Sequence, residues 1–150
     1  MTYLLDTCII SKLRKLRLNP NPELEKWFTQ HSETSYYLSV ITLGEIQGGI
    51  AKFSQERPEE NKQRMLLEDW LFGELVPRFN DRILPIDSHV AFTWGCLNGK
   101  SQQNGKKIPI ADGLIAATAI HYGLIVVTEN LRDFKESQVE VINPSRSEPG

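Results

Sequence analysis

Acidic residues in this sequence stand where apolar segments end or begin, at points far apart along the chain. Asp6 directly follows the apolar residues 3–5, and Asp112 heads the small, apolar run 113–119. In a parallel α/β domain, such positions converge at the carboxyl edge of the sheet. Carboxylates gathered there repel one another unless a cation binds between them. Four acids have this placement: Asp6, Glu45, Asp112 and Asp133.

Oxygen-only ligands of this kind favour Mg²⁺ or Mn²⁺, and carboxylate-held Mg²⁺ activates water and stabilises charge on a phosphoryl oxygen. The predicted chemistry is therefore phosphodiester hydrolysis. Asp6 and Asp112 would hold the main ion, while Glu45 and Asp133 would complete its ligands or orient the attacking water. Neighbouring hydroxyl and amide side chains are candidates to support these ligands by hydrogen bonds: Thr7, Ser11, Thr128 and Asn130.

Each acid also has a purely structural interpretation. Asp6 could cap the helix that follows it, and Thr42-x-x-Glu45 matches a capping box. Asp112 follows the helix-starting Pro109 by three residues, where the helix dipole favours an acid. A further strand-end acid, Asp87, is predicted to be only a helix cap. For the four acids together these interpretations weaken, because all four are predicted at one edge of the sheet.

Several other classes of site are excluded by what the sequence lacks. It contains neither a G-x-G-x-x-G nor a P-loop motif, no G-x-S-x-G elbow, and no histidines at metal-ligand spacing. Cys8 and Cys96 form no C-x-x-C pair, which fits a reducing compartment. No run approaches the roughly 18 apolar residues of a membrane span, and no secretory signal is visible. We expect a cytoplasmic protein. Its net charge of −2 gives no strongly basic nucleic-acid footprint, although it does not exclude nucleic acid.

Short apolar strands alternating with helices, in the order β-α-α-β-α-α-β-α-α-β-α-β, predict a three-layer α/β/α fold around a parallel sheet of about five strands. One helix is predicted over 42–50, closed by Gly48-Gly49, and a longer one over 58–76, ended by Pro77. Residues 1–143 are predicted to form one domain, and 144–150 a loose tail.

Four motifs resemble the PIN-domain family, and in particular the VapC-type toxins of bacterial toxin–antitoxin pairs. They are Leu5-Asp6-Thr7-Cys8, Thr42-Leu43-Gly44-Glu45, Pro109-x-x-Asp112-Gly113 and Thr128-Glu129-Asn130-x-x-Asp133-Phe134. The resemblance implies a PIN fold, metal-dependent endoribonuclease activity, a homodimer, and inhibition by a small antitoxin whose tail lies along the active-site groove. The family's four acids fall on Asp6, Glu45, Asp112 and Asp133, which implies an intact catalyst.

Two residues depart from the family pattern. Cys8 stands where the family usually has Asn, which removes a polar group near the site. Glu129 stands where the family usually has Arg, which replaces a positive charge by a negative one. Glu129 is therefore either an extra metal ligand or a residue that points away and alters the RNA preference.

Basic residues near the acids are candidates to bind RNA. We favour Lys106 and Lys107, because their loop leads into the predicted Asp112 helix; Lys12 and Lys15, on the helix after Asp6, are further candidates. A phosphoacceptor signalling domain, which needs a lysine at a late strand end, is discounted because Thr128-Glu129-Asn130 stands at that position. Two alternatives stay open: a PIN ribonuclease of RNA maturation, and a catalytically idle PIN module used for binding.

Overall fold

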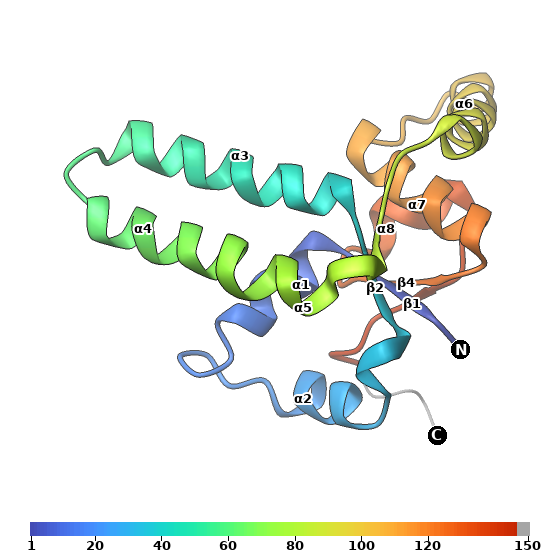
Figure 1. The fold of residues 1–150 in the computed structure, drawn as a ribbon. Coiled ribbons are helices and arrows are strands. Elements are labelled where there is room, and N and C mark those ends of the chain that lie inside the picture. The colour runs from blue at the N-terminus through green and yellow to red at the C-terminus, as the bar shows by residue number, and fades with distance from the viewer. Residues whose placement is uncertain (147–150) are drawn as a thin grey trace.

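The computed structural model describes residues 1–146 of the 150-residue chain. Five parallel strands form one sheet in the order β3-β2-β1-β4-β5, with helices on both faces (Figure 1). The predicted three-layer α/β/α fold with a parallel sheet is therefore confirmed. The strands are β1 Tyr3–Leu5, β2 Tyr36–Ser39, β3 Ile83–Leu84, β4 Ile125–Val127 and β5 Val141–Ile142.

The helices that cover the sheet are predominantly amphipathic or buried, as their connections between parallel strands require. Three short 3₁₀ turns lie between a helix and the next strand: η1 Glu33–Ser35, η3 Asn80–Arg82 and η4 Lys135–Ser137. The helices are α1 Thr7–Arg14, α2 Pro22–Thr29, α3 Val40–Glu56, α4 Asn61–Trp70, α5 Val76–Phe79, α6 Ser88–Gln103, α7 Ile110–Tyr122 and α8 Leu131–Phe134.

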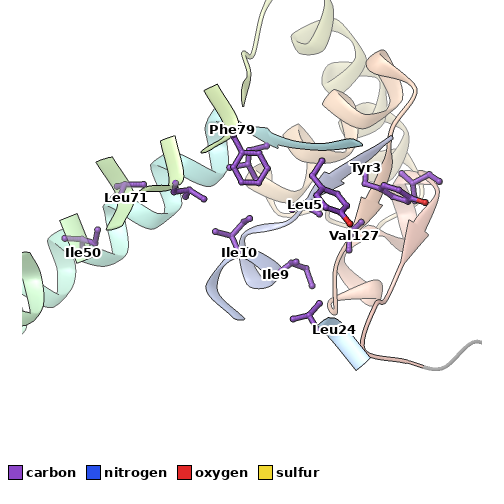
Figure 2. Packing of buried hydrophobic residues seen from close by; sticks show 13 residues of the cluster. Tyr3, Leu5, Ile9, Ile10, Leu24, Ile50, Leu71, Phe79 and Val127 are labelled. Atoms are coloured by element: carbon purple, nitrogen blue, oxygen red, sulfur yellow. The ribbon is translucent and has the colours of Figure 1, made fainter. Parts of the chain in front are cut away.

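The core is divided by the sheet into two clusters, because successive strand residues point to opposite faces. Leu5 and Val127 pack with Ile9 and Ile10 of α1, Leu24 of α2 and the α4–α5 region (Figure 2). Leu4 and Val126 point the other way, against α7 and α8. Every residue of β1 and β4 is buried, as expected of strands covered on both faces.

Helix α3 is much longer than the predicted 42–50, since it begins at Val40 and continues to Glu56. Gly48 and Gly49 do not end it. A glycine costs a helix interior only about 1 kcal/mol relative to alanine, and α3 packs along α4, with which it forms the long arm that projects from the sheet (Figure 1). Because Ser39 caps α3 through the Ile41 N–H, the alternative interpretation of Thr42–Glu45 as a capping box does not hold.

The predicted helix 58–76 is three consecutive elements. Helix α4 begins at Asn61, a π-helical turn η2 follows over Leu71–Leu75, and α5 continues to Phe79. Pro77 does not end the helix, because it lies in the first turn of α5, where a missing N–H is tolerated. Leu71, Leu75 and Phe79 are the buried residues of this segment, and they pack in the same core cluster as the strand residues Leu5 and Val127.

The predicted tail, 144–150, is only partly described, since residues 147–150 lie outside the described range. Within the described part, the Ser145 hydroxyl donates a hydrogen bond to Glu129. No helix within residues 1–146 is both long and apolar enough to cross a membrane.

Candidate active site at the carboxyl edge of the sheet

Asp6 is the anchored member of the acid group. It follows β1 directly, is only 5% exposed, and caps α1 by accepting a hydrogen bond from the Thr7 N–H (2.8 Å). Its other oxygen, Oδ2, accepts from the buried Thr128 hydroxyl (2.7 Å) at the end of the neighbouring strand β4. The capping and the functional interpretations of Asp6 are therefore compatible, because a single carboxylate meets both demands.

Cys8 lies beside this carboxylate. Its Sγ is 3.6 Å from Asp6 Oδ2 and 3.6 Å from the Thr128 hydroxyl. Burial raises the pKa of the Cys8 thiol, and the Asp6 charge raises it too, against the lowering effects of hydrogen bonds with the Glu129 backbone and the Thr128 side chain. Cys8 is consequently a neutral thiol at physiological pH, a weak donor where the family usually has an amide.

Glu45 reaches the same edge from α3. It lies in the second turn of that helix, is exposed, and accepts a hydrogen bond from the Thr7 hydroxyl at 2.7 Å. The Thr7 hydroxyl is also 3.0 Å from that of the buried Thr42. Thr7 thus links two of the predicted acids, because its N–H binds Asp6 and its hydroxyl binds Glu45.

Asp112 occupies the first turn of α7, as predicted. Its helix begins close to α6: a Cβ on Gly113 would lie 3.0 Å from Trp94 Nε1. Burial raises the pKa of Asp112 to about 6, and the charges of Asp6, Asp133 and Glu45 contribute to the rise. Four acids from distant parts of the sequence are therefore within electrostatic reach of one another.

Asp133 is exposed in α8, and Asn130 precedes that helix. The Asn130 side chain makes no capping hydrogen bond, whereas its backbone N–H donates to the Thr128 hydroxyl (3.0 Å). Thr128 therefore joins the turn before α8 to Asp6. Ser11, half-buried on α1, donates to none of the four acids in the part of the chain that the structure describes.

The structure places Glu129 and the candidate lysines as follows. Glu129 forms an ion pair with Lys12, a contact that could not be predicted from the residue order. Lys106 forms an ion pair with Glu136 (3.3 Å), while Lys107 and Lys15 are exposed and have no ion pair within residues 1–146.

To hold a metal ion, several of the acidic side chains must reach the same point in space. Among the described residues, no three carboxylate, imidazole or thiol side chains lie close enough together to hold a metal ion in this arrangement. The donor set nevertheless suits a hard divalent cation, because it consists of carboxylates whose mutual repulsion contributes to the raised pKa of Asp112. The exposed Glu45 and Asp133 side chains would have to rotate to bring ligands together around such an ion.

Comparisons with known proteins agree with this architecture. The PIN domain family matches residues 3–138. VapC ribonuclease Y4jK of Sinorhizobium fredii is 33% identical over 140 residues, covering 93% of this chain and 95% of that protein. Toxin FitB of Neisseria gonorrhoeae is 36% identical over 141 residues, covering 94% and 96%.

Solved structures give the same result. The FitAB complex bound to a DNA fragment, IR36, contains a chain that superposes with a TM-score of 0.85 at 33% identity, with 98% of each chain covered. The FitAcB crystal structure from Neisseria gonorrhoeae gives a TM-score of 0.84 at 35% identity, covering 95% of this chain and 98% of that one. The fold, the family match over residues 3–138 and the identity shared with these relatives show that this chain belongs to the PIN-domain family.

Proposed function

We propose that this protein is a metal-dependent endoribonuclease and the toxin of a toxin–antitoxin pair. The observation that carries the proposal is the convergence of Asp6, Glu45, Asp112 and Asp133 at one edge of the sheet, close enough that the charges of three of them help to raise the pKa of the fourth. Relatives named as a VapC ribonuclease and as the toxin FitB support it.

Asp6 and Asp112 would hold Mg²⁺ or Mn²⁺, with Glu45 and Asp133 as further ligands. Such an ion, when bound, supplies activation of a water and stabilisation of charge on the phosphoryl oxygen. The chain's own contribution is to fix the ligands: Thr7 and Thr128 hold both oxygens of Asp6 in place. Thr7 also orients Glu45, and the exposed Asp133 would orient water or complete the ligands.

Most of Asp112 is ionised at pH 7 and above, because its pKa of about 6 lies below that pH. Ionisation is a precondition for binding a cation, so the activity should fall as the pH drops through about 6. RNA is the proposed substrate, with the exposed Lys107 and Lys15 among the residues that would contact its backbone.

An antitoxin is the proposed protein partner. A groove of about 440 Å³ lies between α1 and the α4–α5 segment and is lined by apolar and basic side chains and by the acidic Glu74. Trp70 forms one wall, with Arg14 stacked over its ring, and the neighbouring Phe72 is 63% exposed. Trp27 and Phe28, by contrast, pack against the core. This groove suits an amphipathic antitoxin helix. Homodimerisation is proposed from family membership and is tested by light scattering of the purified chain.

The direct test is cleavage of a mixed pool of tRNA and mRNA by purified, antitoxin-free protein with Mg²⁺, with Mn²⁺ and with a chelator. We expect metal-dependent cutting at discrete sites that is lost in Asp6→Asn. Asp81→Asn, which alters an acid just before β3 at the opposite edge of the sheet, is the matched control and should cut normally. A folded protein that cuts nothing would favour the idle PIN module. Cutting without toxicity in cells would favour an enzyme of RNA maturation.

A further inference from the structure

Lys12 of α1 and Glu129, at the end of β4, form an ion pair at the margin of the acid group. The two residues lie far apart in the sequence and meet because β1 and β4 are neighbours in the sheet. Glu129 directly follows Thr128, whose hydroxyl binds Asp6. Lys12 stands about one and a half turns along the helix that Asp6 caps. The pair therefore flanks the place where a scissile phosphate would have to bind.

Glu129 is the fixed partner. Its side chain is 21% exposed, and its Oε1 accepts a hydrogen bond from the Ser145 hydroxyl (2.7 Å). Ser145 is itself held by Asn21 Nδ2 (3.3 Å) and by Asn143, which accepts from the Ser145 N–H (3.0 Å). Burial would raise the pKa of Glu129, but the hydrogen bonds from Lys12 and Ser145 and the Lys12 charge outweigh it and lower that pKa. Glu129 is thus a fixed anion.

Lys12 is the movable partner. Its side chain is 46% exposed and carries the ammonium group on a flexible stem. Within residues 1–146, Glu129 is its ion-pair partner. The ammonium group can leave Glu129 for another anion at little cost, because exposed ion pairs contribute only about 0.2–1 kcal/mol. An RNA phosphodiester carries the same single negative charge as Glu129. It would therefore compete with Glu129 for the same ammonium group.

Both carboxylate oxygens of Glu129 have partners, which bears on its role. Oε2 pairs with the Lys12 ammonium group, whose positive charge would repel a metal cation bound to the same carboxylate. The arrangement fits a carboxylate that stands in for a phosphate better than it fits a ligand. Glu129 stands where the family usually has Arg. The positive charge beside the site is therefore that of Lys12 on α1, and Glu129 partly neutralises it.

We propose that Glu129 competes with the RNA backbone for Lys12 and so lowers RNA affinity. The proposal rests on the proposed ribonuclease function. Glu129 acts on substrate binding and on its salt dependence, and Lys12 contacts a phosphate once RNA displaces the carboxylate. The bond-breaking step does not involve Glu129. Removing its charge should accordingly lower KM and leave kcat unchanged.

The test is a double-mutant cycle measured by fluorescence anisotropy with a short, labelled, single-stranded RNA of mixed sequence. All proteins carry Asp112→Asn to prevent cleavage, alone or with Glu129→Gln, Lys12→Met or both. Gln keeps an oxygen for Ser145, and Met keeps the apolar stem of Lys12. We expect Glu129→Gln to tighten binding about threefold to fivefold when Lys12 is present, and clearly less when Lys12 is replaced by Met. Lys12→Met should flatten the salt dependence by about 0.7 in slope.

Two controls separate the alternatives. Lys15→Met, on the same helix but without an acidic partner among the described residues, should weaken binding equally in the presence and in the absence of the Glu129→Gln substitution. Calorimetry with Mn²⁺ on the chain with Asp112 intact should give the same affinity for the parent and for Glu129→Gln. Equal tightening by Glu129→Gln with and without Lys12 would overturn the competition, and lost Mn²⁺ affinity would make Glu129 a ligand. If either result is found while the parent protein still cuts RNA, only the competition between Glu129 and RNA is overturned. If the parent protein neither binds nor cuts RNA, the proposed function is overturned as well.

Discussion

Replacing Asp112 by Asn should stabilise the metal-free protein at neutral pH. Asp112 is buried enough, and close enough to Asp6, Asp133 and Glu45, that its pKa rises to about 6. In the unfolded chain the same group ionises at its ordinary, lower pKa. The folded protein therefore loses stability as the pH rises from about 4 to about 6, and this loss persists at higher pH. Asparagine has no charge to repel, so the variant escapes the loss.

The magnitude follows from the two pKa values. A pKa of about 6 against 3.8 corresponds to about 3 kcal/mol at a pH well above both. Asp112 is partly exposed, so solvent screening reduces this to roughly 1.5 kcal/mol. The folded pKa already includes the interaction of the Asp112 charge with the amino end of α7. The expected net gain is therefore about 1.5 kcal/mol, or about 3–6 °C in Tm for a chain of this length.

The assay is thermal or urea unfolding of the parent and of Asp112→Asn in chelator, from about pH 4 to about pH 8. The difference in free energy of unfolding should be close to zero at about pH 4 and reach its full value by about pH 7. Saturating Mn²⁺ should reverse the order, because only the parent can bind the ion strongly. Asp81→Asn should show neither effect. A variant less stable than the parent at about pH 7.5 in chelator, or a difference independent of pH, would refute the raised pKa of Asp112.

Three further predictions follow from the same contacts. Thr128→Val removes the hydroxyl that binds Asp6 and the Asn130 N–H, so it should cost about 1–3 kcal/mol in unfolding and lower Mn²⁺ affinity about tenfold or more; an unchanged Tm and affinity would show that Thr128 does not position Asp6. Gly113→Ala should lower stability by about 1 kcal/mol despite the better helix propensity, because the new Cβ would stand 3.0 Å from Trp94 Nε1; a rise in Tm would mean that Trp94 moves aside freely. Lys107→Glu should weaken RNA binding and flatten its salt dependence more than Lys106→Glu does, since Lys106 already pairs with Glu136; the opposite ranking by anisotropy would remove Lys107 from the RNA contacts.

Much of the fold could be predicted from the sequence, because the buried strands are short apolar runs and the acids stand at their ends. Leu4 and Leu5 lie in a continuous apolar segment, and Asp6 marks its carboxyl end whether it caps a helix or binds a ligand. Asp87 is a second example, since it caps α6 as predicted, through the Val90 N–H.

Features that depend on packing could not be predicted in this way. Gly48 and Gly49 are typical helix terminators, yet α3 continues beyond them to Glu56 and is stabilised there by contacts with α4. The π-helical turn before Pro77 has no reliable signal in the residue order. The Lys12–Glu129 pair depends on β1 lying beside β4, and the order of strands in a sheet is a property of the folded chain. The sequence left two roles open for Glu129, and its contacts with Lys12 and Ser145 exist only in the folded chain.

The central claim is that four carboxylates at one edge of the sheet form a metal site, and calorimetric titration with Mn²⁺ tests it most directly. The account predicts binding at about pH 7.5 that is lost in Asp6→Asn and Asp112→Asn, kept in Asp81→Asn, and strongly weakened at about pH 5, where Asp112 is protonated. Binding at about pH 6, where about half of Asp112 is protonated, should also release protons, seen as heats that depend on the ionisation enthalpy of the buffer. Absence of binding by the folded parent, or binding that survives both substitutions, would contradict the account.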